Sequence, residues 1–105
     1  GVLHIGPDFS STSKTSSYTL TASDIGTLVT TDSAVTVDPN IFTAGDAITI
    51  YNDSTSDITI TEGTGVTFYL AGTATTGNRT LAQRGVCTVL CVGSNTFAVS
   101  GGGLT

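Results

Sequence analysis

The chain has 105 residues, of which 38% are hydrophobic and 10% are charged, and its formal net charge is −5. A chain of this length has room for one domain with one hydrophobic core. Eight acidic residues outnumber three basic ones and no basic patch is present, so we expect no nucleic-acid partner. No apolar run approaches the roughly 18 residues of a membrane span and no signal-peptide pattern precedes Val2, so we expect no membrane partner.

Residues 1–16 are expected to form an extended N-terminal arm and a Ser/Thr linker. The arm has an apolar tip, which contains Val2, Leu3, Ile5 and Phe9. A Ser/Thr linker has no core to join, so the tip is either a strand added to the edge of the domain or an arm that docks on a neighbour. We favour the arm and expect these four residues to make an oligomer or capsid contact.

The domain is expected to span residues 17–101. Short runs bounded by turn residues predict its first three strands, at 18–20, 27–31 and 34–37. Ser23 and Asp24 can cap a tight turn or a single 3₁₀ turn, and Gly26 can take the left-handed conformation that ends it. Pro39 ends the third strand because proline has no N–H group to donate to a ladder.

The central part of the chain shows the strongest period-two pattern. Isoleucines alternate with other residues on both sides of a polar turn, at positions 48, 50, 58 and 60. This pattern predicts two antiparallel strands that form a hairpin with one face buried. Residues 66–70 are expected to add a third strand, and Phe42 is expected to plug one end of the core. The small residues at 71–78 predict a loop.

Near the C-terminus, a brief strand at 79–81 and a turn at 82–85 are expected to precede a hairpin that pairs residues 86–92 with residues 96–100. Along 86–92 the side chains alternate between two largely apolar faces, with Val86, Leu90 and Val92 on one face and Cys87, Val89 and Cys91 on the other. One face must pack against the core, and a subunit partner is the simplest cover for the other. We therefore expect Leu90 and Val92 near an oligomer or capsid contact. Residues 102–105 are expected to be a flexible tail unless something holds Leu104.

Residues that could support catalysis or metal binding are few. Cys87 and Cys91 are four residues apart on a strand, about 13 Å, which is beyond the ~7 Å that a disulfide tolerates. We expect both to be reduced and buried. His4 lacks a neighbouring group that would activate either thiol, and a zinc site lacks its fourth ligand. We expect no enzyme activity, no cofactor and no metal.

The other polar patterns also have simpler explanations. Asp53 and Asp57 flank a turn without the EF-hand pattern that calcium binding would need. Glu62 has no aromatic sugar platform around it, as a glycosidase carboxylate would need. Asn52 and Asn78 begin matches to the N-glycosylation pattern, which arise readily by chance in a chain rich in Ser and Thr.

Eight or nine short strands with turn signals every eight to twelve residues predict an all-β domain. We expect an antiparallel β-sandwich or a jelly-roll-like barrel of about eight short strands. A parallel arrangement built from βαβ units would need helices, and the sequence predicts none.

Eight short segments of the chain follow one another in a characteristic order and spacing. They are SYTL at 17–20, DIG at 24–26, IFTAGDAITIYN at 41–52, ITI at 58–60, GVT at 65–67, AGT at 71–73, GNRTLA at 77–82 and NTFAVSG at 95–101. In these segments the chain resembles a β-rich module at the C-terminal ends of tailed-bacteriophage structural proteins, especially those of the cyanophage type. The resemblance implies a virion module, commonly trimeric, on tail fibres, head fibres or small capsid-decorating proteins. It implies no catalytic residue.

The resulting functional expectation is a bacteriophage virion structural protein, a capsid decoration or cement protein that binds the capsid surface as a homotrimer. Its partners would be its own copies and the major capsid protein or another virion protein. The short region before residue 17 favours this hypothesis over a fibre, and Gly1 is consistent with removal of a preceding Met. The alternative is the receptor-binding tip of a tail or head fibre, with the loop at 71–78 recognising a host surface glycan. A small secreted hydrolase ranks third because no acid–base pair can be named.

Overall fold

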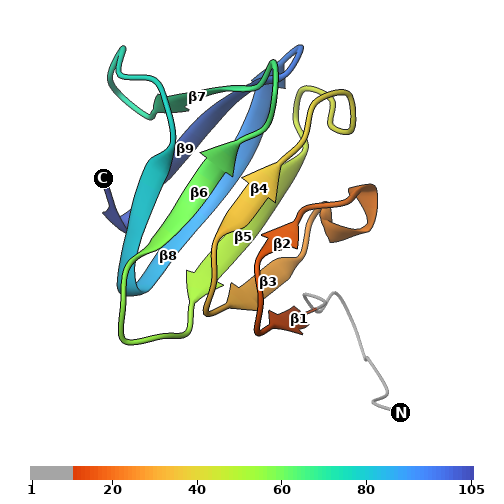
Figure 1. Ribbon diagram of the computed structural model, residues 1–105. Coiled ribbons are helices and arrows are strands. Elements are labelled where there is room, and N and C mark those ends of the chain that lie inside the picture. Colours follow the sequence, from red (N-terminus) through yellow and green to blue (C-terminus); the bar gives the residue numbers. More distant parts are fainter. Residues whose placement is uncertain (1–10) are drawn as a thin grey trace.

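The computed structural model describes residues 11–105, which form nine β-strands and one short 3₁₀ helix, η1 (Figure 1). The apolar tip with Val2, Leu3, Ile5 and Phe9 therefore lies outside the described residues, as does His4. The elements in chain order are β1 (Ser11–Lys14), β2 (Tyr18–Thr19), η1 (Ala22–Asp24), β3 (Leu28–Thr31), β4 (Val35–Val37), β5 (Ala47–Asn52), β6 (Ile58–Glu62), β7 (Thr67–Leu70), β8 (Arg79–Gly93) and β9 (Thr96–Leu104).

The first six strands form a flattened coil. β1, β3 and β5 pair side by side in parallel, and so do β2, β4 and β6. The chain alternates between these two sets, and Figure 1 shows β2, β4 and β6 in front of β3, β5 and β8. Parallel strands need a long crossover connection, commonly a helix. Here a strand of the opposite layer provides most of each crossover, so the parallel pairing needs no helix.

β8 connects the two layers. Its first residues pair antiparallel with β6, as in Leu81 with Ile58, and its later residues pair antiparallel with β5, as in Leu90 with Ala47. The described strands therefore belong to one mixed sheet that folds over itself, in the order β1-β3-β5-β8-β6-β4-β2. β9 pairs antiparallel with β8, and β7 pairs parallel with β9. The register shifts between Leu81 and Val86, where β8 bends, and Arg84 has a φ of 58° there.

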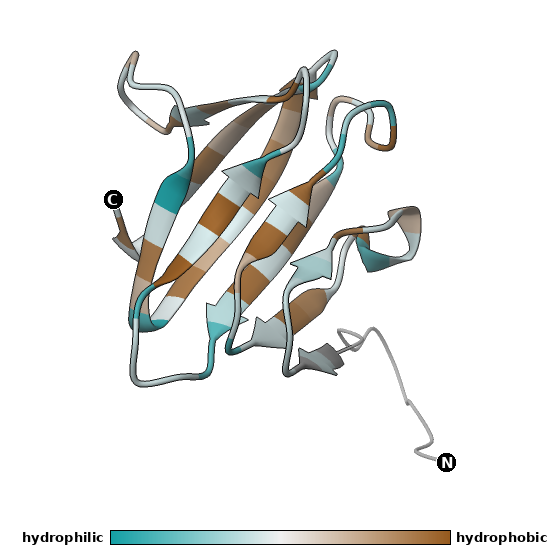
Figure 2. Cartoon of the chain, in the orientation of Figure 1, coloured by the Kyte–Doolittle hydropathy of each residue, from teal (hydrophilic) through white to brown (hydrophobic). Residues whose placement is uncertain are grey.

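The core lies between the two layers. Figure 2 shows hydrophobic and polar residues alternating along the strands, as expected when one face of each strand is buried. Ile50 on β5 and Ile60 on β6 are fully buried, one from each layer. Phe42 is buried at one end, where its ring packs edge-to-face against Phe97 with the ring centroids 5.9 Å apart. The predictions of an all-β fold and of a core position for Phe42 are confirmed.

The prediction of antiparallel pairing is wrong for much of the sheet. The expected hairpin between residues 47–52 and 58–62 does not form, because the polar turn between them carries the chain from one layer to the other. β5 and β6 each pair with β8 instead. An antiparallel sandwich or a jelly-roll barrel is therefore not supported. The expected turn at 82–85 is also wrong, since these residues lie within β8.

Two segments that we expected outside the strands belong to the sheet. Ser11–Lys14, within the expected linker, forms β1 and pairs with β3. β9 continues through the glycine-rich tail to Leu104, which pairs with Leu81. Other predictions are confirmed: the 3₁₀ turn η1, the positive φ of Gly26 (74°), and the last hairpin between β8 and β9.

Candidate assembly interface

The outer face of the layer that contains β5, β8 and β9 leaves large apolar side chains in contact with solvent. Val86, Leu90 and Val92 on β8 are 43%, 37% and 50% exposed, and Tyr69 on β7 is 40% exposed. Cys87, Val89 and Cys91, which alternate with the outward positions of β8, are buried in the core, as the period of two requires. The expectation that the two faces of this strand differ in this way is confirmed. Exposed large apolar side chains that lie together mark interaction sites.

The strand register aligns these side chains in rows across the sheet. One row runs through Tyr69, Ala98, Leu90 and Ala47, which are cross-strand neighbours on β7, β9, β8 and β5. The next rows pair Thr88 with Ser100 and Val86 with Gly102 between β8 and β9. We call the outward-facing positions of β5, β7, β8 and β9 in these rows the outer face.

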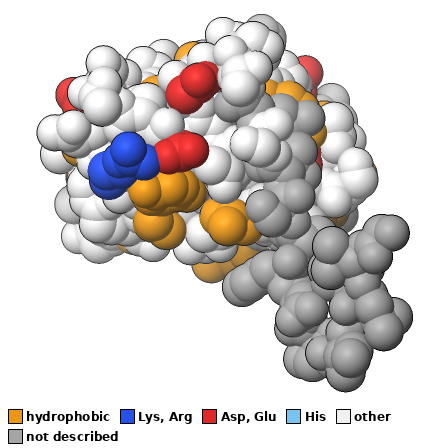
Figure 3. Space-filling model, turned by 90° about the horizontal axis from the view of Figure 1, so that it is seen from below, with side chains coloured by type: hydrophobic (Ala, Val, Ile, Leu, Met, Phe, Trp, Pro, Cys, Tyr) orange, Lys and Arg blue, Asp and Glu red, His pale blue; other side chains and the backbone are white. Residues whose placement is uncertain are grey.

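The rows of the outer face contain no charged residue. At the bend of β8, one end of the face meets an ion pair between Arg84 and Asp53. Figure 3 shows hydrophobic side chains beside a basic and an acidic side chain at this end of the molecule. An apolar centre with charged groups at its margin is the usual arrangement of a protein–protein interface.

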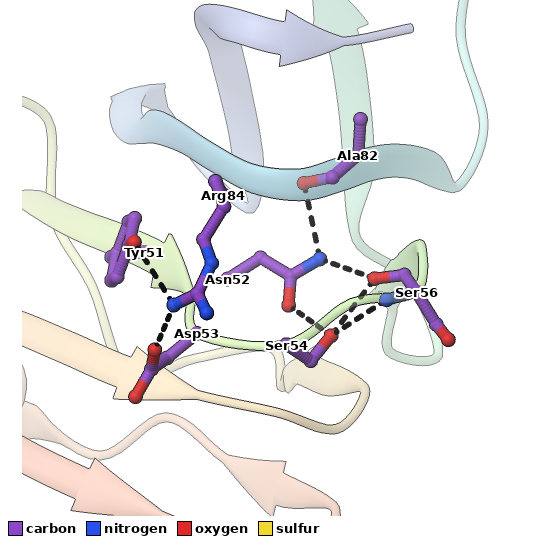
Figure 4. Close-up of polar contacts among 7 residues, drawn as sticks. All are labelled: Tyr51, Asn52, Asp53, Ser54, Ser56, Ala82 and Arg84. Atoms are coloured by element: carbon purple, nitrogen blue, oxygen red, sulfur yellow. Dashed lines mark hydrogen bonds and ion pairs between the residues drawn. The ribbon is translucent and has the colours of Figure 1, made fainter.

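Arg84 fixes the bend of β8 to the crossover between β5 and β6. Its guanidinium donates hydrogen bonds to the carboxylate of Asp53 and to the hydroxyl of Tyr51 (Figure 4). The hydrogen bond to Tyr51, followed by the attraction of the two neighbouring oxygen groups, raises the pKa of Arg84 above its usual range. All three groups lie at the surface or near it, so the pair positions the chain more than it stabilises the fold.

Asn52 supports the same bend from the inside. Its side chain is fully buried, and its amide nitrogen donates to the carbonyl oxygens of Ser56, Leu81 and Ala82 at 2.7, 3.0 and 3.1 Å. Its amide oxygen accepts a hydrogen bond from the hydroxyl of Ser54 at 2.7 Å. Figure 4 shows the side chain pointing toward Ser56 and β8. The match to the glycosylation pattern at Asn52 thus coincides with a buried structural amide.

Cys87 and Cys91 are reduced and buried, as predicted. Burial raises the pKa of the Cys87 thiol to about 12, because the core disfavours the thiolate. The thiol of Cys91 donates to the carbonyl oxygen of Gly93. The Cys87 thiol therefore stays protonated near neutral pH and is a poor nucleophile. Both cysteines are buried and serve as small core residues.

The outer face of the opposite layer differs in chemistry. Its outward positions on β2, β4, β6 and the first part of β8 are threonines, namely Thr19, Thr36, Thr59, Thr61 and Thr80. We call this set the threonine face. Its hydroxyl groups are compatible with water, whereas the outer face exposes leucine, valine and tyrosine. The two sides of one small domain are thus chemically distinct.

Of the residues predicted to make an oligomer or capsid contact, Leu90 and Val92 are exposed on β8, whereas the arm residues lie outside the described part of the chain. That these residues make such a contact stays a prediction. Tyr69 was missed as a member, although the alternation of 67–70 places it opposite the buried Phe68. Residues 71–76 of the loop are all exposed.

Other kinds of site find no support in the described residues. Between residues 11 and 105 there is no pocket, and no group of three or more His, Cys, Asp and Glu side chains could hold a metal ion. No helix in this part of the chain is long and apolar enough to cross a membrane. Fold and surface together define an all-β protein with one folded mixed sheet and one exposed apolar face. The chain matches none of the family models, curated proteins and solved structures with which it was compared.

Proposed function

We propose that the chain is a structural protein of a tailed-bacteriophage virion, a capsid decoration or cement protein that binds the capsid surface as a homotrimer. Two independent considerations support the proposal. The first is that the short segments from residue 17 onward resemble, in their order and spacing, a virion module. The second is that the outer face offers a contact surface without any catalytic group. The partners are other copies of the chain and the major capsid protein or another virion protein.

The observation that carries the proposal is the exposure of Leu90, Val86, Val92 and Tyr69 on one face of a small, stiff β domain. Surface of this kind costs about 25 cal/mol for each Å² that stays in contact with water, so its burial favours association. A protein whose most distinctive surface is an apolar sheet face is suited to join a lattice of subunits.

The copy number on purified phage particles tests this function. A capsid decoration protein repeats across the shell, so quantitative mass spectrometry against the major capsid protein should give a number in the hundreds per particle. A few copies per particle, or recovery with detached tails, would exclude the decoration role.

The runner-up function is the receptor-binding tip of a tail or head fibre. The observation in its favour is the loop between β7 and β8. Residues 71–76 of this loop are all exposed, and their side chains are small, so a glycan could approach the loop closely. A glycan array probed with the native oligomer distinguishes the two functions. Binding to a defined glycan that is lost when residues 73–76 are changed to alanine or glycine would favour the fibre tip.

A further inference from the structure

We propose that copies of this chain meet through the outer face, and that β8 of one copy packs into a trough along β9 of a second copy. The proposal deepens the proposed function, on which it rests for the homotrimer, by assigning the surface through which copies of the chain meet. It follows from the size of the side chains that the register places next to one another.

Along the outer face, β8 has larger residues than β9 in each row. Leu90 lies beside Ala98, Thr88 beside Ser100 and Val86 beside Gly102. Over these three rows β8 therefore forms a ridge, and β9 forms a trough of small residues from Ala98 to Gly102. The row through Leu90 continues this alternation, because Tyr69 precedes Ala98 and Ala47 follows Leu90.

A surface with a ridge and a trough side by side fits a copy of itself. When two such faces meet with β8 over β9, Leu90 of one copy lies against Ala98 of the other, and Val86 lies against Gly102. Sheet faces pack through such interdigitation of side chains. In a ring of three, the ridge half of each face meets the trough half of the next, which is a heterologous contact that closes.

The outer face itself adds no charge repulsion against a second copy. The chain has a net charge of −5, so identical copies repel one another except where their surfaces are uncharged. The rows of the outer face contain no Asp, Glu, Lys or Arg, and the ion pair of Arg84 with Asp53 at its margin is already neutralised. A strongly charged partner such as a nucleic acid would find no complementary group on this face.

The size of the face sets the expected strength. Four strands about 4.8 Å apart and the roughly 20 Å from residue 86 to residue 92 give a planar area on the order of 400 Å². The accessible area of a corrugated face is larger, and about 600 Å² per partner marks the lower end of specific interfaces. The face thus lies near or below this lower end, and we expect weak, reversible association.

An exchange of the ridge and trough residues tests the proposal. Sedimentation equilibrium of the purified chain should show that Leu90→Ala and Ala98→Leu each raise the dissociation constant about tenfold, because one removes the ridge and the other fills the trough. The double variant should return to within about threefold of wild type, because the small side chain at position 90 of one copy then lies against the large side chain at position 98 of the other. Within one chain the double variant merely swaps two cross-strand neighbours, so its fold should be kept.

Thr59→Ala on the threonine face is the matched control and should leave the dissociation constant unchanged. If Leu90→Ala fails to fold, Val86→Ala and Gly102→Val provide a second pair with the same logic. A double variant no tighter than its weaker parent would overturn the proposal. So would a wild-type chain that stays monomeric alone, and in that case the copy number on phage particles would still decide the proposed virion role independently.

Discussion

Among single residues, Asn52 makes the largest set of side-chain contacts in the described chain, because one buried amide joins β5, the following crossover and β8. Its donors satisfy carbonyl oxygens at the point where the register of β8 shifts and the regular ladder is interrupted. A buried carbonyl without a partner costs about 1 to 3 kcal/mol, so this position is one where a polar residue in the core is required.

Asn52→Ala should therefore lower the free energy of unfolding by about 2 to 3 kcal/mol. Urea denaturation followed by circular dichroism measures the change. Ser54→Ala is the matched control. It removes the donor to the Asn52 amide oxygen and two exposed hydrogen bonds between the Ser54 hydroxyl and the Ser56 backbone, and it leaves the three carbonyl contacts of Asn52 in place, so it should cost less than about 1 kcal/mol. An Asn52→Ala variant as stable as Ser54→Ala would show that the amide does not hold the bend.

The two buried thiols give a second prediction at this scale. Cys87 and Cys91 should not react with a thiol reagent in the folded protein near neutral pH, and both should react after unfolding in urea. Rapid labelling of either thiol under native conditions would contradict the burial of this face of β8.

The raised pKa of Cys87 also predicts the effect of alkaline pH. The native state keeps its proton up to about 12, whereas the unfolded state loses it near 8.5, so the native state binds more protons between these values. The contribution of Cys87 to stability is fully present below pH 8.5 and is lost as the pH rises toward 12. Cys87→Ala should show a shallower alkaline fall in urea midpoint than the wild type.

At the scale of the elements, the closest approach of β8 to β9 is at Gly101. A Cβ atom on Gly101 would lie 2.0 Å from the carbonyl oxygen of Val86 and 2.5 Å from the Cα of Cys87, and its φ of 154° is strained for other residues. Gly102, the next residue, has open space around its Cβ position. The glycine run is thus not a uniform flexible tail, since one of its members is required where two backbones approach.

Gly101→Ala should therefore destabilise the fold by about 3 kcal/mol or more, because overpacking and backbone strain add. Gly102→Ala is the matched control and should stay within about 1 kcal/mol of the wild type. Thermal unfolding of the two variants measures the difference. Equal melting temperatures would mean that the backbone of β9 can move away from β8 at no cost.

The elements also show how far sequence reasoning reaches. The alternation of Ile48 and Ile50, and of Ile58 and Ile60, predicts strands and their buried faces, and both predictions are confirmed. The alternation does not reveal which other strand each of these strands pairs with. A short polar turn between two alternating segments fits a hairpin and a crossover between layers equally well, and the long strand β8, interrupted by a bulge, provides the neighbour for both. The candidate interface was partly predictable from the sequence. An apolar residue that alternates with the buried residues of a strand points away from the core, so it is a candidate for contact with another molecule.

For the whole molecule, the outer face and the threonine face differ in chemistry. One side of the folded sheet exposes hydroxyl groups, and the other exposes Leu90, Val86, Val92 and Tyr69. Association through the apolar side leaves the threonine side in water. The assembly should therefore have a defined outside, as a protein that coats a larger particle requires.

The native protein should have the mass of three chains in light scattering at micromolar concentration. Leu90→Asp should reduce it to one chain, because a buried, unpaired carboxylate at the contact is strongly unfavourable. Thr59→Asp on the threonine face places the same charge at an exposed strand position and should leave the trimer intact. Added salt should strengthen the association, since it screens the repulsion between chains of charge −5. A monomeric wild type, or a weaker trimer at high salt, would contradict this prediction.

The position of β8 in the chain order has a consequence for synthesis. β1 to β6 leave the ribosome before the strand that both of their layers need, so β5 and β6 each lack the strand on their second side until Leu81 and Leu90 have been made. Contacts between residues so far apart in sequence are formed late, and proteins dominated by them fold in milliseconds to seconds. We therefore expect the core to stay open until β8 has been made. The abundant serines and threonines, and the excess of acidic over basic groups, should oppose aggregation of that intermediate.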